Sequence, residues 1–460
     1  MNVASAKVNL VYTILVGLVV GFLLGFIDTY GYAVTGYTTA ELSPIVSVIL
    51  TYPLLSKILR RKPFIVEHLI SVIIASGISL TTTITSGMYI TYTMLSRIAD
   101  PKLIGLPEWL YMSSLDVNVY ALIFYMYAVL VSAVGVVIAY IFHRHFIEKE
   151  RLAYPIGLAY SMLIQVSRAF RKLNIILPIV VGITLHLIAF TYGTSIFDLT
   201  PILQKILPGS SLALTLDIFI FFLALLIPLN TSLGIGLGNL IMYLIITPTL
   251  VSLGLMSILP FMKSSDIALE ASPYTASIMV GFITIAIIYY FLTSRSAFIL
   301  TFKLLIRNTH LLKRLILALA LITSSFILIF TLIELPLTFM LIMPFYLSIH
   351  LLLVLLTLRV VGETGTASQA TLPLATFTLF MSGARGALTY ALLDPYTGVP
   401  MPQFMAGSSM NIIKGAKRLG LEPNVTVNLL ILSLLIGAPI TFIYGHYLLL
   451  AYGLNSPKLN

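Results

Sequence analysis

Long apolar stretches, each about the length of a membrane crossing, constrain this chain more than any other feature. Asn9–Ile27, Val119–Phe142 and Val425–Leu450 contain no Asp, Glu, Lys or Arg. A helix that crosses the hydrocarbon core needs roughly 20 such residues. Only 9% of the 460 residues are charged, against about 25% in soluble domains. The sequence therefore predicts one all-α membrane domain over residues 1–460, a polytopic helix bundle of about 12–14 transmembrane segments.

Lys and Arg residues fall in short clusters between the apolar stretches. The cluster Lys57, Arg60, Arg61 and Lys62 follows the second predicted helix, and the positive-inside rule places it in the cytoplasm. This assignment puts the N-terminus in the cytoplasm and predicts a multi-pass protein of the cell membrane, in contact with the lipid bilayer. The net charge of +10 comes from these clusters and does not indicate nucleic-acid binding. The chain has no cysteine, which excludes disulfides and thiolate metal ligands.

Two apolar stretches are too short for a clean crossing and have basic residues on both sides. They are Leu152–Val166 and Ala297–Ile306. A full crossing would place one basic cluster outside, so we expect each stretch to be re-entrant or to lie along the interface. Transporters built from two related halves leave such a repeat. An internal repeat would divide this chain into halves of about residues 1–210 and 211–460.

The stretch Arg359–Thr366 places an arginine, a glutamate and two glycines between two apolar segments. Glycine frees backbone conformations, and a broken membrane helix is tolerated only where it lines a cavity or contacts protein. We therefore predict a half-helix junction at Gly362 and Gly365, near a transport site. Glu363 would bind a proton, a cation or a substrate ammonium; the alternative is an i,i+4 ion pair with Arg359. Gln369, just beyond the junction, is a further candidate.

Pro228–Asn239 is the second candidate segment, because its glycines alternate with apolar residues. This spacing does not produce the small-residue stripe of a packed membrane helix. We expect an unwound segment that offers neutral hydrogen-bonding groups to a polar zwitterion. Those groups are Asn230, Thr231, Ser232 and Asn239.

Ionisable residues inside a membrane usually face a cavity or a partner. Glu67, His68 and Asp217 fall within predicted spans and are candidates for proton or substrate binding on this ground. Glu67 and His68 follow a basic cluster closely, so an interfacial role is the alternative for both. Asp217 lies in the first turns of its span, where it would cap the helix or reach the interface.

Motifs of soluble enzyme chemistry are absent. The sequence has no G-x-S-x-G, H-E-x-x-H or Walker-type motif. His143 and His145 have a spacing that suits a metal, but they lie among basic residues, and we expect a solvated cluster. We therefore predict no enzyme activity, no catalytic residues, no cofactor and no metal site. The alternative is an intramembrane lipid- or glycan-modifying enzyme that uses carboxylates in the predicted loops Arg97–Asn118 and Gly383–Met401.

Four stretches, in this order, resemble segments of the oligopeptide transporter (OPT) superfamily, in particular an OPT-like prokaryotic branch. They are Glu148–Gly157 (EKERLAYPIG), Ile227–Gly238 (IPLNTSLGIGLG), Arg359–Gly365 (RVVGETG) and Gly407–Gly420 (GSSMNIIKGAKRLG). This chain is shorter than typical members and has no Asn-Pro-Gly signature. Asn411–Lys414 also lacks the acidic residue that the family has before its lysine.

The resemblance implies a secondary transporter, coupled to protons, that moves short peptides or metal–chelate complexes. We expect a small-molecule or peptide substrate, and a homodimer is compatible with this reading. Alternating access would move one half of the bundle against the other around a midplane site. A passive channel would be expected to have a repeated pore motif, which the sequence does not show.

Overall fold

The computed structural model describes most of the chain, and every structural statement below refers to the described residues. They are residues 9–35, 38, 40–84, 103, 105–107, 119–167, 177, 180–184, 196–215, 224–225, 227–259, 262–332, 337–367, 372–383, 385–393 and 402–452. The chain divides into two compact units. Unit 1 contains Met1–Arg168 and Ala286–Asn460, and unit 2 contains Ala169–Ile285. The predicted division near residue 210 stays a prediction.

The all-α membrane fold predicted from the apolar stretches is confirmed. Within the described residues, nine helices are long and apolar enough to cross a membrane, so the chain is a multi-pass membrane protein. Two further predicted spans, about residues 173–192 and 212–227, fall mostly outside the described ranges.

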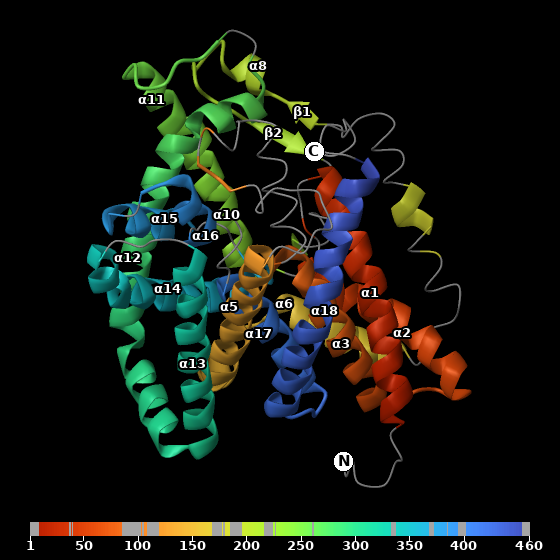
Figure 1. Cartoon of the computed structure of the whole chain (residues 1–460). Coiled ribbons are helices and arrows are strands. Elements are labelled where there is room, and N and C mark those ends of the chain that lie inside the picture. Colours follow the sequence, from red (N-terminus) through yellow and green to blue (C-terminus); the bar gives the residue numbers. More distant parts are fainter. Residues whose placement is uncertain are drawn as a thin grey trace. The chain divides into compact units, whose positions relative to one another are not determined.

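Unit 1 contains most of the helices, including the later part of α12 (Ser264–Arg307), which crosses the boundary between the units (Figure 1). The other helical elements of unit 1 are α1 (Leu10–Thr35), η2 (Ala40–Leu42), α2 (Ser43–Leu59), α3 (Ile65–Ile84), α5 (Val119–His143), η4 (Arg144–Lys149), α6 (Pro155–Ser167), α13 (Thr309–Leu332), α14 (Leu337–Thr364), α15 (Leu372–Met381), α16 (Ala387–Leu393), α17 (Pro402–Arg418) and α18 (Pro423–Tyr452).

Helix α3 is one of two buried helices in unit 1, and α1, α2 and α18 pack around it (Figure 1). Of its 20 residues, 17 are buried, so almost none of its surface remains for lipid. Of the serines and threonines near its end, Ser79, Thr81 and Thr82 are buried and therefore do not face lipid. Thr81, for example, shares a 2.9 Å hydrogen bond with the hydroxyl of Thr441 on α18.

Helix α17 is the second buried helix, and it packs against α5, α6, α14 and α18. Its buried residues include Gln403, Ser408, Ser409 and Asn411. Burying polar groups costs free energy unless they find hydrogen-bond partners. The buried polar side chains of α17 therefore need hydrogen-bond partners on the neighbouring helices.

The segment between α5 and α6 is folded into the core, which corrects one prediction. Helix α5 runs into the π-helical turn η4, and both His143 and His145 are buried. They are therefore not the solvated cluster expected from the neighbouring basic residues. The short helix α6 follows the irregular residues 151–154 and has 13 residues, which agrees with the short segment predicted there. Its side chains at Ile156, Tyr160 and Ile164 are fully buried.

Unit 2 contains a two-stranded sheet and several helices. Strands β1 (Ile196–Asp198) and β2 (Ala213–Thr215) pair antiparallel. The helical elements are α8 (Thr200–Leu203), α10 (Leu229–Ile241), η5 (Met242–Ile246), α11 (Thr247–Ser252) and the first part of α12. The Asp198 carboxylate connects the start of α8 to the start of α12, because it accepts hydrogen bonds from the backbone N–H groups of Thr200 and Ser264.

Two local predictions for α10 and α12 were wrong. The segment after Pro228 is a regular helix, α10, and is not unwound, because three alternating glycines weaken a helix without breaking its hydrogen-bond ladder. Ala297–Ile306 is not a separate short segment either, since it continues the 44-residue helix α12. The repeat inferred from two short basic-flanked segments therefore loses one of its two members.

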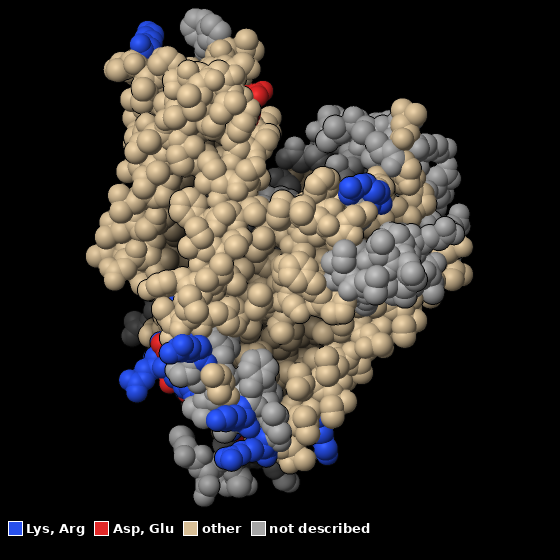
Figure 2. All heavy atoms as spheres, turned by 90° about the vertical axis from the view of Figure 1, so that its left-hand side faces the viewer, with Lys and Arg blue, Asp and Glu red and all other residues tan. Residues whose placement is uncertain are grey.

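Charged side chains are sparse on the surface. Figure 2 shows one face that is mostly uncharged, with most of the visible Lys and Arg side chains near its lower edge. Such a surface suits contact with lipid over most of its area and with lipid headgroups or water at the charged end.

Candidate functional site

The break predicted in Arg359–Thr366 exists, but only one of its two glycines makes it. Helix α14 continues through Gly362 to Thr364, and Gly365 then adopts a left-handed φ of +89°. Glycine adopts this conformation without strain. Gly362 serves packing instead, because a Cβ atom there would lie 2.6 Å from Cδ1 of Leu152. The helix therefore ends at the second glycine of the predicted pair.

Asn411 of α17 holds the broken end of α14 against the start of α6. Its Nδ2 donates to the carbonyl oxygen of Gly365 over 2.7 Å, and its Oδ1 accepts from the backbone N–H of Gly157 over 3.3 Å. Tyr154 adds two bonds to the same helix end, from its N–H to the Gly362 carbonyl and from its hydroxyl to the Leu358 carbonyl. Hydrogen bonds at the end of α14 thus connect three helices, α6, α14 and α17.

The substitution of Asn411 measures how much its side-chain hydrogen bonds to Gly365 and Gly157 stabilise the fold. We expect Asn411→Ala to lower the free energy of unfolding by about 1–2 kcal/mol, because it leaves the Gly365 carbonyl buried without a partner. Thermal unfolding in detergent checks this. The control is Asn424→Ala at an exposed position on α18, which loses only a surface bond from Arg314. Equal melting temperatures for the two variants would show that the hydrogen bonds of Asn411 do not stabilise the fold.

A cluster of charged and polar side chains centres on Glu150, which follows η4. Its Oε1 lies 2.7 Å from Nε2 of His145 and accepts a 2.6 Å hydrogen bond from the hydroxyl of Tyr290. Its Oε2 lies 3.5 Å from Nη1 of Arg359. Burial raises the pKa of the Glu150 carboxyl, but the bonds from His145 and Tyr290 and the charge of Arg359 outweigh burial and lower it. Glu150 is therefore ionised at neutral pH.

Arg359 lies between this cluster and a cavity. Its guanidinium lies 4.6 Å from the centre of the Tyr290 ring, in cation–π geometry. On the other side, its Nε lies 3.4 Å from Oε1 of Glu363, so the i,i+4 pair predicted as the alternative role of Glu363 is present. Both side chains border a cavity of about 570 Å³, together with Tyr289 and Thr293 of α12.

Glu41 of η2 reaches the other side of the break. Its Oε1 accepts a 2.7 Å hydrogen bond from the backbone N–H of Ala367, two residues beyond Gly365, and lies 3.5 Å from the hydroxyl of Ser408 on α17. No cation in the described ranges forms an ion pair with it. Glu41 thus connects the start of α2 with the end of α14 and with α17.

Helices α14 and α17 run in the same direction along each other, joined by His350–Gln403 at one end and Gly365–Asn411 at the other. We call this interface the α14–α17 seam. The two helices that form it have four buried polar atoms without a hydrogen-bond partner among the described residues. They are His350 Nε2, Thr357 Oγ1, Gln403 Oε1 and Ser409 Oγ. Most buried polar atoms are hydrogen-bonded, so four exceptions on two adjoining helices need an explanation.

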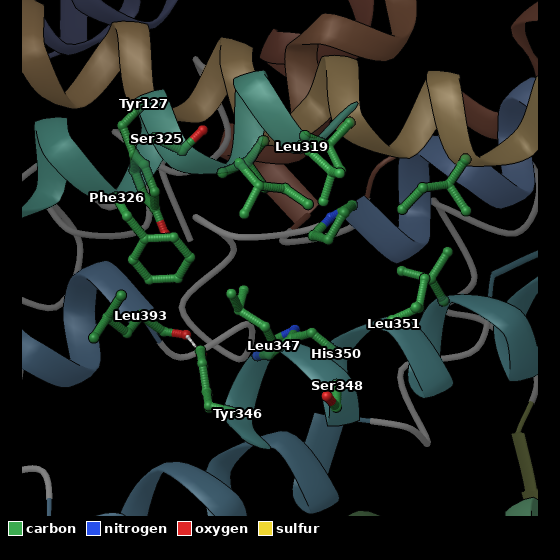
Figure 3. A pocket seen from close by; sticks show the side chains of 16 residues that line it. Tyr127, Leu319, Ser325, Phe326, Tyr346, Leu347, Ser348, His350, Leu351 and Leu393 are labelled. Carbon is green, nitrogen blue, oxygen red and sulfur yellow. Dashed lines mark hydrogen bonds between the residues drawn. The ribbon is translucent and has the colours of Figure 1, made fainter. Parts of the chain in front are cut away.

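One end of the α14–α17 seam borders a second cavity, of about 260 Å³ (Figure 3). Its lining is mostly apolar and comes from α5, α13 and α14, with Leu393 and Pro402. Figure 3 shows the rings of His350 and Tyr346 on α14, opposite Leu319 and Phe326 on α13. The hydroxyl of Tyr346 donates to the Leu393 carbonyl over 2.6 Å, whereas His350 is the polar side chain of this lining with an unpaired atom.

Two other predicted site residues, Glu67 and His68, do not join this group. Glu67 is buried and bound by Arg61 and by two backbone N–H groups. His68 contacts the Val48 carbonyl and the Ser167 hydroxyl, so both residues have structural partners. The four polar residues of the second candidate segment lie on α10 in unit 2; they are Asn230, Thr231, Ser232 and Asn239. Asp217 and Gln369 lie outside the described residues.

Sequence reasoning missed Glu41, His145, Glu150 and Tyr290. Glu41 begins a predicted helix and reads as a helix-capping residue, and Glu150 lies in a basic run that reads as solvated. The partners of both come from distant parts of the chain: Ala367 lies 326 residues from Glu41, and Tyr290 lies 140 residues from Glu150. The sequence contained one signal that could have indicated Glu41: it is a carboxylate near the end of a predicted span without a nearby basic partner.

Comparisons with protein-family models, with curated proteins and with solved structures found no match for this chain.

Proposed function

We propose that this chain is a secondary active transporter, coupled to protons, for a small zwitterionic solute such as a short peptide or a metal chelate. The sequence resemblance to the OPT superfamily supports this proposal. The observation that carries it is a pair of opposite charges, Arg359 and Glu363, on the wall of one 570 Å³ cavity. A zwitterion needs one group of each sign within a few ångströms, and this wall offers both.

The Arg359–Glu363 ion pair is weak enough to open for a substrate. The two side chains are 36% and 41% exposed, and exposed pairs at i,i+4 stabilise by only about 0.3–0.5 kcal/mol. Glu150 and the Tyr290 ring hold the guanidinium from the opposite side. Arg359 therefore keeps its position when Glu363 turns away, so that a substrate carboxylate binds Arg359 while its ammonium binds Glu363.

In this proposal, the end of α14 and the α14–α17 seam change their packing during transport. Unpaired buried polar atoms are costly in a membrane interior, and a transporter alternates between at least two packings. In the proposed cycle, the four unpaired atoms of α14 and α17 gain partners, either water, substrate or other side chains, in a second packing of the same helices.

Uptake into proteoliposomes tests the proposal. With an inward proton gradient, we expect the wild-type protein to accumulate radiolabelled alanyl-alanine or a metal chelate. Glu363→Gln should lower this uptake roughly tenfold or more, because losing one hydrogen bond to a charged group costs about 1.5–3 kcal/mol.

The matched control is Glu148→Gln. This substitution breaks the Lys417–Glu148 ion pair, whose side chains have a similar exposure of 34% and 46% and do not border the cavity. We expect it to keep near wild-type uptake. Equal uptake by both variants would show that the substrate site is elsewhere, and no uptake of either solute by the wild-type protein would contradict the transport function itself.

A further inference from the structure

A group that carries a coupling proton must exist both charged and neutral, and the carboxylates with firm ionic partners do not suit this task. Glu67 accepts two hydrogen bonds from Arg61, and Glu150 is held by His145, Tyr290 and Arg359. Each would lose strong interactions on protonation. Glu363 is paired with Arg359 and is 41% exposed, which suits substrate contact better than proton storage.

Glu41 differs from these three carboxylates in its surroundings. Both of its hydrogen bonds, from Ala367 and Ser408, go to Oε1. Its Oε2 accepts no hydrogen bond in the described part of the chain, and it is not among the fully buried polar atoms. Oε2 is therefore open to receive a proton without any bond being broken first.

The charged groups on the surrounding elements are engaged elsewhere or lie far along their helices. Asp28 of α1 is connected through Thr38 to the residue before Glu41: Thr38 donates to Asp28 and accepts from the N–H of Ala40. Thr38 also bonds Thr83 near the end of α3. The other titratable groups on α2, α3, α14 and α17 are Lys57, Glu67, His68, His350, Arg359, Glu363, Lys414, Lys417 and Arg418.

Protonation of Glu41 would loosen the junction that it holds. Hydrogen bonds to an ionised carboxylate are roughly twice as strong as those to a neutral one. With a proton on Oε2, the bonds from the Ala367 N–H and the Ser408 hydroxyl to Oε1 become neutral and weaken. The start of α2 is then less firmly tied to the end of α14 and to α17.

We propose that Glu41 carries the coupling proton, on Oε2, and that its protonation frees the end of α14 and α17 to move. This inference rests on the transport function proposed above. The proton enters Oε2 from water on one side of the membrane and leaves it on the other, so that one proton crosses with each cycle. Arg359 and Glu363 bind the substrate, and Glu41 couples its movement to the gradient.

Two transport measurements on one set of variants separate these roles. In proteoliposomes, proton-driven accumulation of radiolabelled alanyl-alanine needs the coupling proton, whereas exchange without a gradient needs only substrate binding and movement. We expect Glu41→Gln, which mimics the protonated carboxyl, to lose accumulation but retain exchange. Glu363→Gln should lose both. Accumulation that persists in Glu41→Gln and disappears in Asp28→Asn would overturn the assignment in favour of Asp28.

A measurement without transport keeps the inference testable if alanyl-alanine is not carried. Infrared difference spectra of the purified protein, taken between acid and alkaline pH, detect the carbonyl band of a carboxyl that gains and loses a proton. We expect this band in the wild-type protein and in Asp28→Asn, and its loss in Glu41→Gln. A wild-type protein without uptake that still has the band contradicts the proposed function alone, and a band that survives in Glu41→Gln contradicts the proton site alone.

Discussion

Gly157→Ala should prevent α6 and α17 from packing closely, and we expect a large loss of stability. A Cβ atom at Gly157 would lie 2.4 Å from the carbonyl oxygen of Asn411, and the contact atom belongs to backbone. Relief requires a shift of all of α17, which is packed against four helices. Gly415 on the facing helix is equally confined, because its Cβ would lie 2.5 Å from the Gly157 carbonyl oxygen.

The expected size of this effect follows from two costs that add. Overpacking a filled interior costs about 1–3 kcal/mol, and displacement of α17 weakens the bond from the Gly157 N–H to Asn411, worth about 1 kcal/mol. We therefore expect a loss of roughly 3 kcal/mol, measured as a lower melting temperature and a lower yield of monodisperse protein in detergent.

The matched control is Gly281→Ala in α12, another glycine inside a membrane helix. A Cβ atom at Gly281 has no neighbour within 4 Å. Alanine favours helix over glycine by about 0.5–1 kcal/mol, so this variant should be as stable as the wild-type protein or more stable. A Gly157→Ala protein that melts like Gly281→Ala would show that α6 and α17 do not approach as closely as described.

The helices themselves could be predicted because their cause is local. Hydrocarbon leaves no partner for backbone N–H and C=O groups, so an apolar stretch of about 20 residues must form a helix wherever it crosses. The short length of α6 was likewise visible in the 15 apolar residues between two basic clusters. The Gly362–Gly365 pair marked the end of α14, although packing against Leu152 keeps Gly362 helical.

The site could be predicted only where its partners lie within one helical turn. Arg359 and Glu363 are four residues apart, and their ion pair follows from this spacing. Glu150 and Glu41 depend on partners that only the packing of α12, α14 and α17 brings to them. His145 was misjudged for the same reason: its charged neighbours in sequence suggested water, but the π-helical turn directs its ring into the bundle.

Glu150→Gln should remove the charge that organises the cluster around Arg359, and should lower the free energy of unfolding by roughly 2 kcal/mol at neutral pH. The Glu150 side chain is only 15% exposed, and it binds His145, Tyr290 and Arg359 at once. A neutral amide keeps the shape of the carboxyl but makes weaker hydrogen bonds. Its NH₂ group also cannot accept from His145 or Arg359.

The pH dependence of this loss has a definite sign. The pKa of Glu150 is lowered in the folded protein from its usual value near 4.5, so the folded state binds this proton less readily than the unfolded state. The stability that Glu150 contributes is therefore complete above pH 4.5 and disappears as the pH falls through the lowered pKa. Wild-type protein should lose stability on acidification below pH 4.5 more steeply than Glu150→Gln, and the two stabilities should converge in acid.

Tyr290→Phe separates the two parts of the cluster. Phenylalanine keeps the ring under the Arg359 guanidinium but removes the hydroxyl that donates to Glu150, so we expect a loss of about 1 kcal/mol, the worth of one hydrogen bond. Glu422→Gln, at an exposed position just before α18, serves as the control and should leave stability unchanged. Parallel pH profiles for wild-type protein and Glu150→Gln would mean that Glu150 gains nothing from its three partners, and the cluster would then be incidental to the position of Arg359.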